Sequence, residues 1–536
     1  MPHHFSLLDW AVVAGYFVIL AISGWWFSRR QPSGAREYFL AGRQMPVWAV
    51  AISVVATATS AATFIGAPEE AYAGNLTYLS TNIGSFLAVA IVATLFIPAF
   101  YRHNVTTVYD LLEVRFGRSA KVAASWTFLA GRVLASGARL FIGAIPLALI
   151  LFGEDSPTAV LVAIGVLVAV GVVYTLVGGI RSVIWTDAIQ TLVFVSAVAA
   201  AAAILLSRIP VPISTIVAEL SATQVAGGSK LSVVTLGLDS TKPMLGFDPS
   251  QAYTLLTALA GFSLLMIAAY GTDHDLAQRM LTCKSAAQGS RSAILAILIN
   301  LPIVALFMCI GLLLYVFYRR PDLMGAAAPG YAPSSQRQVF LSFILAEMPR
   351  GLTGLMMAGL FATGLGSFNS ALNAMAAAFV NDCYTPLRPG RGERHYLVAG
   401  RLAVVGWGVV LGGFAALCVF WQRGSGDTLI KFALNVMTFA YAGLLGVYMT
   451  ALLTRRRGSA RSAVAALLVG FVAVGLMQKQ VWPLWASHVP LRITRPDGTP
   501  TTTLADITLA FPWVLFIATA ICTAVCMLPR THRPAA

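Results

Sequence analysis

Long apolar runs alternate with short polar segments along almost the whole chain. The apolar runs cover residues 8–27, 46–72, 77–101, 122–152, 157–177, 183–206, 252–279, 291–317, 351–381, 396–421, 428–453, 459–477 and 507–528. A helix that crosses a lipid bilayer needs about 20 mostly apolar residues. The pattern therefore predicts an all-α polytopic membrane protein with about 13 transmembrane helices.

The composition agrees with this pattern. Of the 536 residues, 58% are apolar and 11% are charged, which no soluble domain of this size matches. The net charge of +15 comes from basic residues that are scattered among short loops, so we expect contact with anionic membrane lipid and no binding of nucleic acid. Most of these loops fall on one side of the predicted zigzag. This predicts a plasma membrane protein, of a bacterial inner membrane, with its N-terminus outside and its C-terminus in the cytoplasm.

The loops between the runs carry no recognisable chemistry. None exceeds roughly 45 residues and none holds a GxxxxGK[ST] stretch, so ATP is not expected to drive this chain. The histidines at positions 3, 4, 103, 274, 395, 488 and 532 are scattered, and no nucleophile with a base or set of metal ligands is visible. We therefore expect neither an enzyme nor an obligate protein partner.

Three predicted spans are interrupted by polar and small residues, which in a membrane must face protein, ions or water. These interruptions cover residues 53–68, 271–275 and 363–373. The first two lie in the second and seventh spans, five spans apart, and a five-helix unit starting at each would be oppositely oriented. Inverted repeats whose first helix is broken are typical of secondary transporters, which bind ligand and ion at the breaks.

This reading divides the chain into five parts. Residues 1–45 form an extra N-terminal helix and a cytoplasmic loop, 46–206 the first five-helix repeat, and 207–251 an external loop. Residues 252–455 form the second five-helix repeat, and 456–536 two C-terminal helices with a short tail.

Six segments, in order along the chain, resemble motifs of the sodium/solute symporter family. They are Tyr38–Arg43, Ser60–Gly66, Thr107–Gly117, Gly178–Gln190, Asp273–Arg279 and Gly366–Asn373. The family includes sugar, proline, pantothenate, iodide and sialic-acid carriers, and the likeness covers residues from about 38 to 455. It implies a LeuT-type fold with a 5+5 inverted repeat and a sodium-coupled symporter that works by alternating access.

The resemblance implies a main sodium site at the carbonyls of Ala56, Thr59 and Thr363 and at the side chains of residues 366 and 367. Thr363, Gly366 and Ser367 share one face of the ninth span, and oxygen is the donor that sodium prefers. This chain departs from the family because residue 366 is glycine, which removes one oxygen ligand. Proton-coupled or sodium-independent transport is therefore an alternative, and the small residues could instead serve helix packing.

A second cation or proton site is predicted near Asp187. An acid within a span is costly and indicates function by default, and in some family members this position joins hydroxyls of the ninth span. Candidate partners here are Ser367, Asn369 and Ser370. The alternative is an acid at a helix start that pairs with Arg181. His274, between two acids, is a second candidate for proton coupling because histidine titrates near neutral pH.

For the solute, the resemblance brings residues of the second, third and seventh spans towards one cavity. They are Ser60, Thr63, Asn82, Ser85 and Asp273. All can form hydrogen bonds with a polar ligand, although hydroxyls in spans often bond to their own helix. Asp273 could instead lie at the cytoplasmic surface beside Arg279.

Arg139 lies well inside the fourth span, where a guanidinium needs a partner. That partner is either an acid, Asp187 or Asp273, or a carboxylate of the solute, which the planar guanidinium would bind through two hydrogen bonds. We therefore predict sodium-coupled symport of a small polar solute that carries a carboxylate, such as an amino acid or organic acid. A transporter-like membrane sensor is the alternative of another class.

Overall fold

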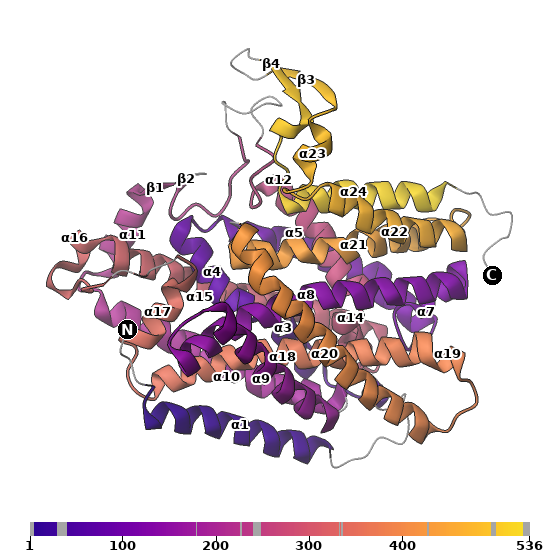
Figure 1. Cartoon of the computed structure of the whole chain (residues 1–536), viewed down its shortest axis with the longest axis horizontal. Coiled ribbons are helices and arrows are strands. Elements are labelled where there is room, and N and C mark those ends of the chain that lie inside the picture. Colours follow the sequence, from indigo (N-terminus) through magenta and orange to yellow (C-terminus); the bar gives the residue numbers. More distant parts are fainter. Residues whose placement is uncertain are drawn as a thin grey trace. The chain divides into compact units, whose positions relative to one another are not determined.

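The computed structural model describes residues 5–28, 40–177, 180–225, 228–238, 248–331, 333, 336–425, 428–494 and 500–528, and the chain is helical through most of them (Figure 1). Parts of two motifs, Tyr38–Phe39 and Gly178–Gly179, lie outside the described residues. The chain divides into two compact units. The first comprises Met1–Leu76, Arg132–Leu231 and Gln278–Ala433, and the second Thr77–Gly131, Ser232–Ala277 and Leu434–Ala536.

The first unit contains the helices α1 (Leu7–Ser28), α3 (Val47–Ala58), α4 (Ala61–Ala73), α9 (Pro157–Val177), α10 (Ile180–Arg208), α11 (Ile213–Ala222), α15 (Ala286–Arg319), α16 (Pro321–Met324), α17 (Val339–Glu347), α18 (Leu352–Ala378), α19 (Thr385–Leu387) and α20 (Glu393–Ser425). A short antiparallel hairpin, β1 (Gln224–Val225) with β2 (Gly228–Ser229), belongs to it as well. Helix α18 is buried along nearly its whole length and packs against α1, α3, α9, α10 and α20. It is therefore the central helix of this unit.

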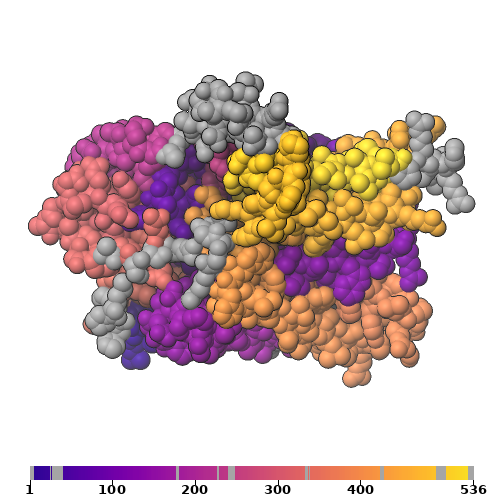
Figure 2. Space-filling view, turned by 45° about the horizontal axis from the view of Figure 1, so that its top comes forward, coloured from indigo at the N-terminus to yellow at the C-terminus, as the bar shows by residue number. Residues whose placement is uncertain are grey.

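The second unit contains α5 (Thr81–Ile91), α6 (Ile97–Arg102), α7 (Asp110–Phe116), α12 (Leu255–Thr257), α13 (Ser263–Ile267), α22 (Ala460–Leu476), α23 (Trp482–Ala486), α24 (Phe511–Met527) and the antiparallel strands β3 (Pro490–Thr494) and β4 (Pro500–Thr503). Helices α22 and α24 pack side by side and lie at the surface seen in Figure 2. Three helices, α8 (Arg118–Phe152), α14 (His274–Met280) and α21 (Leu429–Leu453), contain residues of both units.

The predicted break in the second span is present between α3 and α4, whose axes differ by 65°. Thr59 and Ser60, which connect the two helices, have extended backbones. Thr and Ser are weaker helix formers than Ala or Leu, so a run of them makes a break in the helix less costly. The break therefore falls where the sequence predicts it.

The seventh span is also interrupted where expected. The π-helical turn Ala258–Phe262 joins α12 to α13, and a second π-helical turn, Ala268–Thr272, follows α13. Asp273 then has an extended backbone, and α14 begins at His274. Both first helices of the predicted repeats are thus broken in mid-sequence, as the LeuT-type fold requires.

Ten helices in the described part of the chain are long and apolar enough to span a membrane, or eleven with the bent pair α3–α4. The two C-terminal helices α22 and α24 are apolar but have 17 residues each. The total of 13 spans therefore stays a prediction. So do the boundaries of the two repeats, because the division into compact units does not follow them.

Candidate ion and solute sites

The break between α3 and α4 leaves backbone oxygens without helical partners. The last carbonyls of any helix lack an N–H group four residues further on, and here the N–H of Thr59 bonds to Val55 while the chain turns away after Ala58. The carbonyl of Ala56 thus belongs to a freed helix end. The hydroxyl of Thr59 is buried and has no hydrogen-bond partner among the described residues. The break thus offers the freed carbonyl of Ala56, which is a predicted ligand, and the Thr59 hydroxyl, whereas the prediction for Thr59 concerned its carbonyl.

Helix α18, which carries the other predicted ligands, packs against both α3 and α4. A β-carbon added to its Gly364 would lie 3.9 Å from the Ala61 β-carbon, at the first residue of α4. The hydroxyls of Thr363 and Ser367 are buried and donate to carbonyls of their own helix, at 2.9 Å and 3.0 Å. A hydroxyl that donates its proton still offers lone pairs to a cation.

Gly366 lies against α10. A β-carbon added to Gly366 would lie 2.7 Å from Oε1 of Gln190. Gln190 is 2% exposed, and its Nε2 donates to the hydroxyl of Tyr16 in α1, at 3.4 Å. The carboxamide oxygen of Gln190 therefore fills the space that the hydroxyl side chain at residue 366 occupies in other family members.

Asp187 is buried in a polar cluster in which Arg279 supplies the positive charge. Ser53 Oγ donates to Asp187 Oδ2 at 2.5 Å, and Arg279 Nη2 lies 3.5 Å from the same oxygen. Arg279 also donates to Ser53 at 2.9 Å and to Ser370 at 2.5 Å. Its guanidinium is 1% exposed. Arg279 thus links Asp187 to Ser370, one of its three expected partners, whereas the alternative interpretation had named Arg181 as the basic residue.

Asn369, the remaining partner expected near Asp187, is also buried. Its Oδ1 has no hydrogen-bond partner in the described part of the chain. It lies against α9, because a β-carbon on Gly171 would come within 2.9 Å of it. Asn369 thus places an unsatisfied acceptor towards α9, while its neighbour Ser370 contacts Arg279.

Asp273, in the second unit, begins helix α14. Its Oδ1 accepts from the N–H of Asp275 at 3.0 Å, and its Oδ2 accepts from the hydroxyl of Tyr441 at 2.7 Å. Both carboxylate oxygens therefore have donors, as at a helix N-cap. The next residue, His274, is fully buried with its ring against those of Tyr109 and Phe128.

The other predicted solute residues fall into two groups. In α5, Asn82 donates to the Leu79 carbonyl at 3.1 Å and Ser85 to the Thr81 carbonyl at 3.3 Å, so both bond within their own segment. Ser60 and Thr63, at the start of α4, make no side-chain hydrogen bond among the described residues. Their hydroxyls are therefore the better placed to meet a ligand.

Arg139 lies in α8 and is partly buried. Arg132 and Ser136, which were not among the predicted site residues, share its helix face at spacings of seven and three residues. Both are buried, and the Ser136 hydroxyl has no hydrogen-bond partner among the described residues. The spacing of these polar residues in an apolar span was the signal that could have found them. A polar stripe thus runs along α8.

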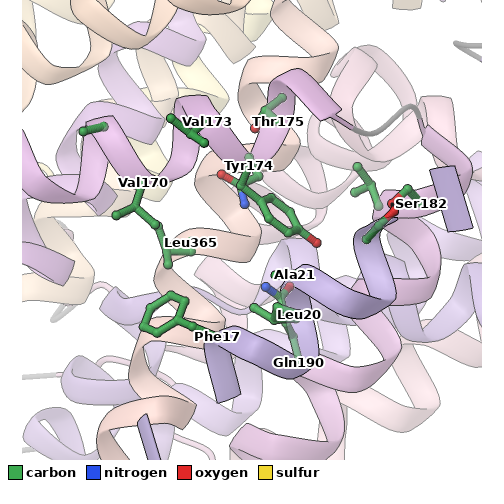
Figure 3. A pocket seen from close by; sticks show the side chains of 14 residues that line it. Phe17, Leu20, Ala21, Val170, Val173, Tyr174, Thr175, Ser182, Gln190 and Leu365 are labelled. Carbon is green, nitrogen blue, oxygen red and sulfur yellow. Dashed lines mark hydrogen bonds between the residues drawn. The ribbon is translucent and has the colours of Figure 1, made fainter. Parts of the chain in front are cut away.

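A cavity of about 670 Å³ lies beside α1, α9, α10 and α18 (Figure 3). Its wall is mostly aliphatic, with Phe17, Leu20, Val170 and Leu365 among the lining residues. Gln190 is one of the few polar side chains in its wall. A polar solute would regain only part of its lost hydration from so apolar a wall, so we do not assign the solute to this cavity.

The C-terminal end of α4 is held by two lysines. Lys431 pairs with Glu70 at 2.7 Å, and the buried Lys230 donates to the carbonyls of Ala71 and Tyr72 at 3.2 Å and 2.6 Å. Burial, and secondly the nearby charge of Arg319, lowers the pKa of Lys230 to about 8. These contacts fix the end of the second half of the broken span.

Paired broken helices with freed backbone oxygens define the class of LeuT-type secondary transporters. A solved structure of a Na⁺-coupled sialic acid symporter, substrate-bound and outward-open, matches with a TM-score of 0.76 at 25% identity and covers 99% of both chains.

The family model of the sodium:solute symporter family matches residues 38–470. The sodium/sialic acid symporter SiaT of Proteus mirabilis is 30% identical over 483 residues, which is 88% of this chain and 90% of the relative. The human sodium-coupled monocarboxylate transporter 1 is 27% identical, over 91% of this chain and 76% of the relative. The chain therefore belongs to the sodium:solute symporter family. It is a sodium-coupled secondary transporter of the membrane and not an enzyme, as the sequence predicts.

Proposed function

We propose that this transporter carries a small carboxylate-bearing solute together with sodium by alternating access. The observation that carries the solute class is Arg139, a guanidinium within a long apolar helix, beside the polar stripe of Arg132 and Ser136. A guanidinium matches a carboxylate through two parallel hydrogen bonds. The sialic acid and monocarboxylate carriers among the relatives are named for solutes of this kind.

The solute ligands with most support are Arg139, Ser60 and Thr63. The two hydroxyls lie at the start of α4, where the chain leaves the break, and they have no competing hydrogen bonds among the described residues. Asp273, Asn82 and Ser85 remain proposed ligands with less support, because each already bonds to protein groups.

The main sodium site is proposed at Ala56, Thr59, Thr363 and Ser367, with residue 366 contributing only its backbone. Freed carbonyls and hydroxyl oxygens suit sodium as hard donors. Since these ligands lie on both α3 and α18, a bound ion would fix the broken span against its neighbour. The solute, bound at the same break, would then bind more tightly, and by reciprocity the solute would strengthen sodium binding.

A second sodium ion near Asp187 has less support. The carboxylate already has Arg279 as its counter-charge, and Ser370 accepts from the same guanidinium. A further cation there would meet a fixed positive charge in a buried site, where repulsion is strong. We therefore propose a single sodium ion per transport cycle.

We further propose that the transporter resides in the plasma membrane of a bacterium with its N-terminus outside and its C-terminus in the cytoplasm. The support is the placement of Lys and Arg in short loops on one side of the predicted zigzag. Labelling of single cysteines introduced in these loops, from outside intact cells, tests the orientation.

Solute binding to the purified protein tests the solute class. N-acetylneuraminate, pyruvate, proline and glucose are titrated by calorimetry in sodium buffer and in choline buffer. We expect a carboxylate to bind in sodium, and Arg139→Gln to weaken it about 10- to 100-fold, as loss of a charged hydrogen-bond pair does. Arg118→Gln, at the exposed start of the same helix, is the control and should bind normally. Binding of glucose alone, or carboxylate binding unchanged by Arg139→Gln, contradicts the proposal.

A further inference from the structure

We propose that Gln190 supplies the oxygen ligand that Gly366 removes from the main sodium site. The inference rests on the proposed sodium site and goes beyond it, because it assigns a ligand from α10, a helix that the site otherwise does not use. Three observations carry it: the position of the Gln190 oxygen, the way in which the side chain is held, and the unsatisfied acceptors of the predicted ion sites.

The Gln190 oxygen occupies the place of the missing side chain. From a β-carbon built on Gly366, Oε1 of Gln190 lies at 2.7 Å, Cδ at 3.5 Å and Nε2 at 3.9 Å. The oxygen is therefore the nearest carboxamide atom, and the nitrogen is turned away. A serine or threonine hydroxyl at residue 366 would extend into the same space. The backbone of Gly366 and the side chain of Gln190 thus replace one hydroxyl residue.

Neighbouring groups hold the carboxamide in this orientation. Nε2 donates to the hydroxyl of Tyr16, which lies on α1. One turn earlier on α10, Asp187 is fixed to α3 by its hydrogen bond with Ser53. Residues three apart on a helix lie on the same face, so Asp187 positions the α10 face that presents Gln190. The extra N-terminal helix α1 thereby helps to orient the proposed ion ligand.

Two buried acceptors of the predicted ion sites lack donors among the described residues, and one of them, Asn369, lies three residues after Gly366 on α18. Thr59 Oγ1 and Asn369 Oδ1 are both buried without hydrogen-bond partners in the described part of the chain, and no described group donates to Oε1 of Gln190. Buried polar atoms without partners are costly, and a group of buried oxygens is stabilised by a hard cation. A neutral carboxamide oxygen is among the ligands that such cations accept.

Exchange of the two residues tests the proposal. Sodium is titrated into the purified protein at constant ionic strength with choline, and the melting temperature gives the half-saturating sodium concentration. Gln190→Ala and the similarly long Gln190→Met should both raise this concentration about tenfold, as loss of one ligand to a charge implies. Gly366→Ser in the Gln190→Ala background should restore it to within about threefold of the wild type.

The controls separate this role from packing. Gly366→Ser alone crowds Gln190 and should bind sodium less well than the double variant, and Gly165→Ser, a site with no atom within 4 Å, should match the wild type. The melting temperature in choline shows that each variant is folded. Unchanged sodium dependence in Gln190→Met, or a double variant no better than Gln190→Ala, overturns the proposal. A wild type that does not respond to sodium would instead contradict the proposed sodium site itself.

Discussion

At the scale of single residues, the Arg279 guanidinium has the greatest need of charged and hydrogen-bonding partners, because it is almost completely buried. Moving an unpaired charge into an apolar interior costs several kcal/mol. Arg279 avoids this because Asp187 balances its charge and Ser53 and Ser370 accept its hydrogen bonds. The cluster connects α3, α10, α14 and α18 through side chains of the first unit, so its primary effect is to hold these helices together.

Removal of one member of this pair should therefore destabilise the protein strongly. We predict that Arg279→Met lowers the free energy of unfolding by about 3–5 kcal/mol, because it leaves Asp187 buried without a counter-charge. The double variant Arg279→Met with Asp187→Asn should recover most of the loss. Thermal unfolding in detergent measures both. Equal losses in the single and double variants would show that the charge balance is unimportant.

The sequence predicted which residues need a polar partner but not which partner each one has, and the reason is physical. An acidic residue within an apolar span is conspicuous in the sequence, so Asp187 could be predicted as functional. Its partner Arg279 lies 92 residues away and is brought near only by helix packing. Arg279 and Gln190 each ended a recognised motif, yet nothing in the sequence shows that they meet Asp187 and Gly366. Composition reveals which groups need partners, whereas the partners themselves come from the tertiary fold.

At the scale of helices, the broken span α3–α4 depends on close packing as well as on its polar residues. A β-carbon added to Gly311 would lie 2.3 Å from the carbonyl oxygen of Pro68. Glycine thus lets α15 approach α4 beside its proline. The end of α4 is held in turn by Lys230 and Lys431.

We predict that Gly311→Ala disturbs this packing. The added methyl group should lower stability by about 1–3 kcal/mol, as overpacking does, and should reduce transport because it displaces α4. Gly165→Ala is the matched control, since its β-carbon meets nothing within 4 Å in the exposed face of α9 and should be neutral or slightly stabilising. Thermal unfolding of both variants provides the comparison, and identical behaviour would rule out this contact.

Lys230 should make the stability of the protein depend on alkaline pH. Its pKa is about 8 in the folded protein and 10.5 ordinarily, so between these values the unfolded chain binds more protons than the folded one. Stability then rises with pH, by at most about 1.4 kcal/mol per pH unit. We predict this rise for the wild type relative to Lys230→Met, with the exposed Lys479→Met as control. Parallel melting temperatures of wild type and Lys230→Met from pH 8 to 10 would contradict it.

The helices themselves were largely predictable, because hydrophobic length and polar interruptions set where spans and breaks occur. The π-helical turns before Asp273 were not, since one extra residue per turn leaves no trace in a hydrophobic pattern. The capping role of Asp273 was not predicted either, because a residue is recognised as a helix cap only once the start of the helix is known.

At the scale of the whole molecule, membership of the sodium:solute symporter family makes transport a matter of coupling between an ion and a solute. If sodium raises solute affinity by some factor, the solute must raise sodium affinity by the same factor. We predict equal factors of about 5- to 150-fold in the wild type, measured by calorimetric titration of each ligand with and without the other. A factor of one in both titrations would show that the two sites are independent, which contradicts coupled binding.

The most direct test of sodium-coupled carboxylate transport is uptake of labelled N-acetylneuraminate, pyruvate and proline into proteoliposomes, under an inward sodium gradient or an inward proton gradient. The account predicts that at least one of these carboxylates accumulates under the sodium gradient, that sodium enters with it, and that Arg139→Gln and Ser367→Ala abolish accumulation. Accumulation that follows the proton gradient and ignores sodium would contradict the central claim.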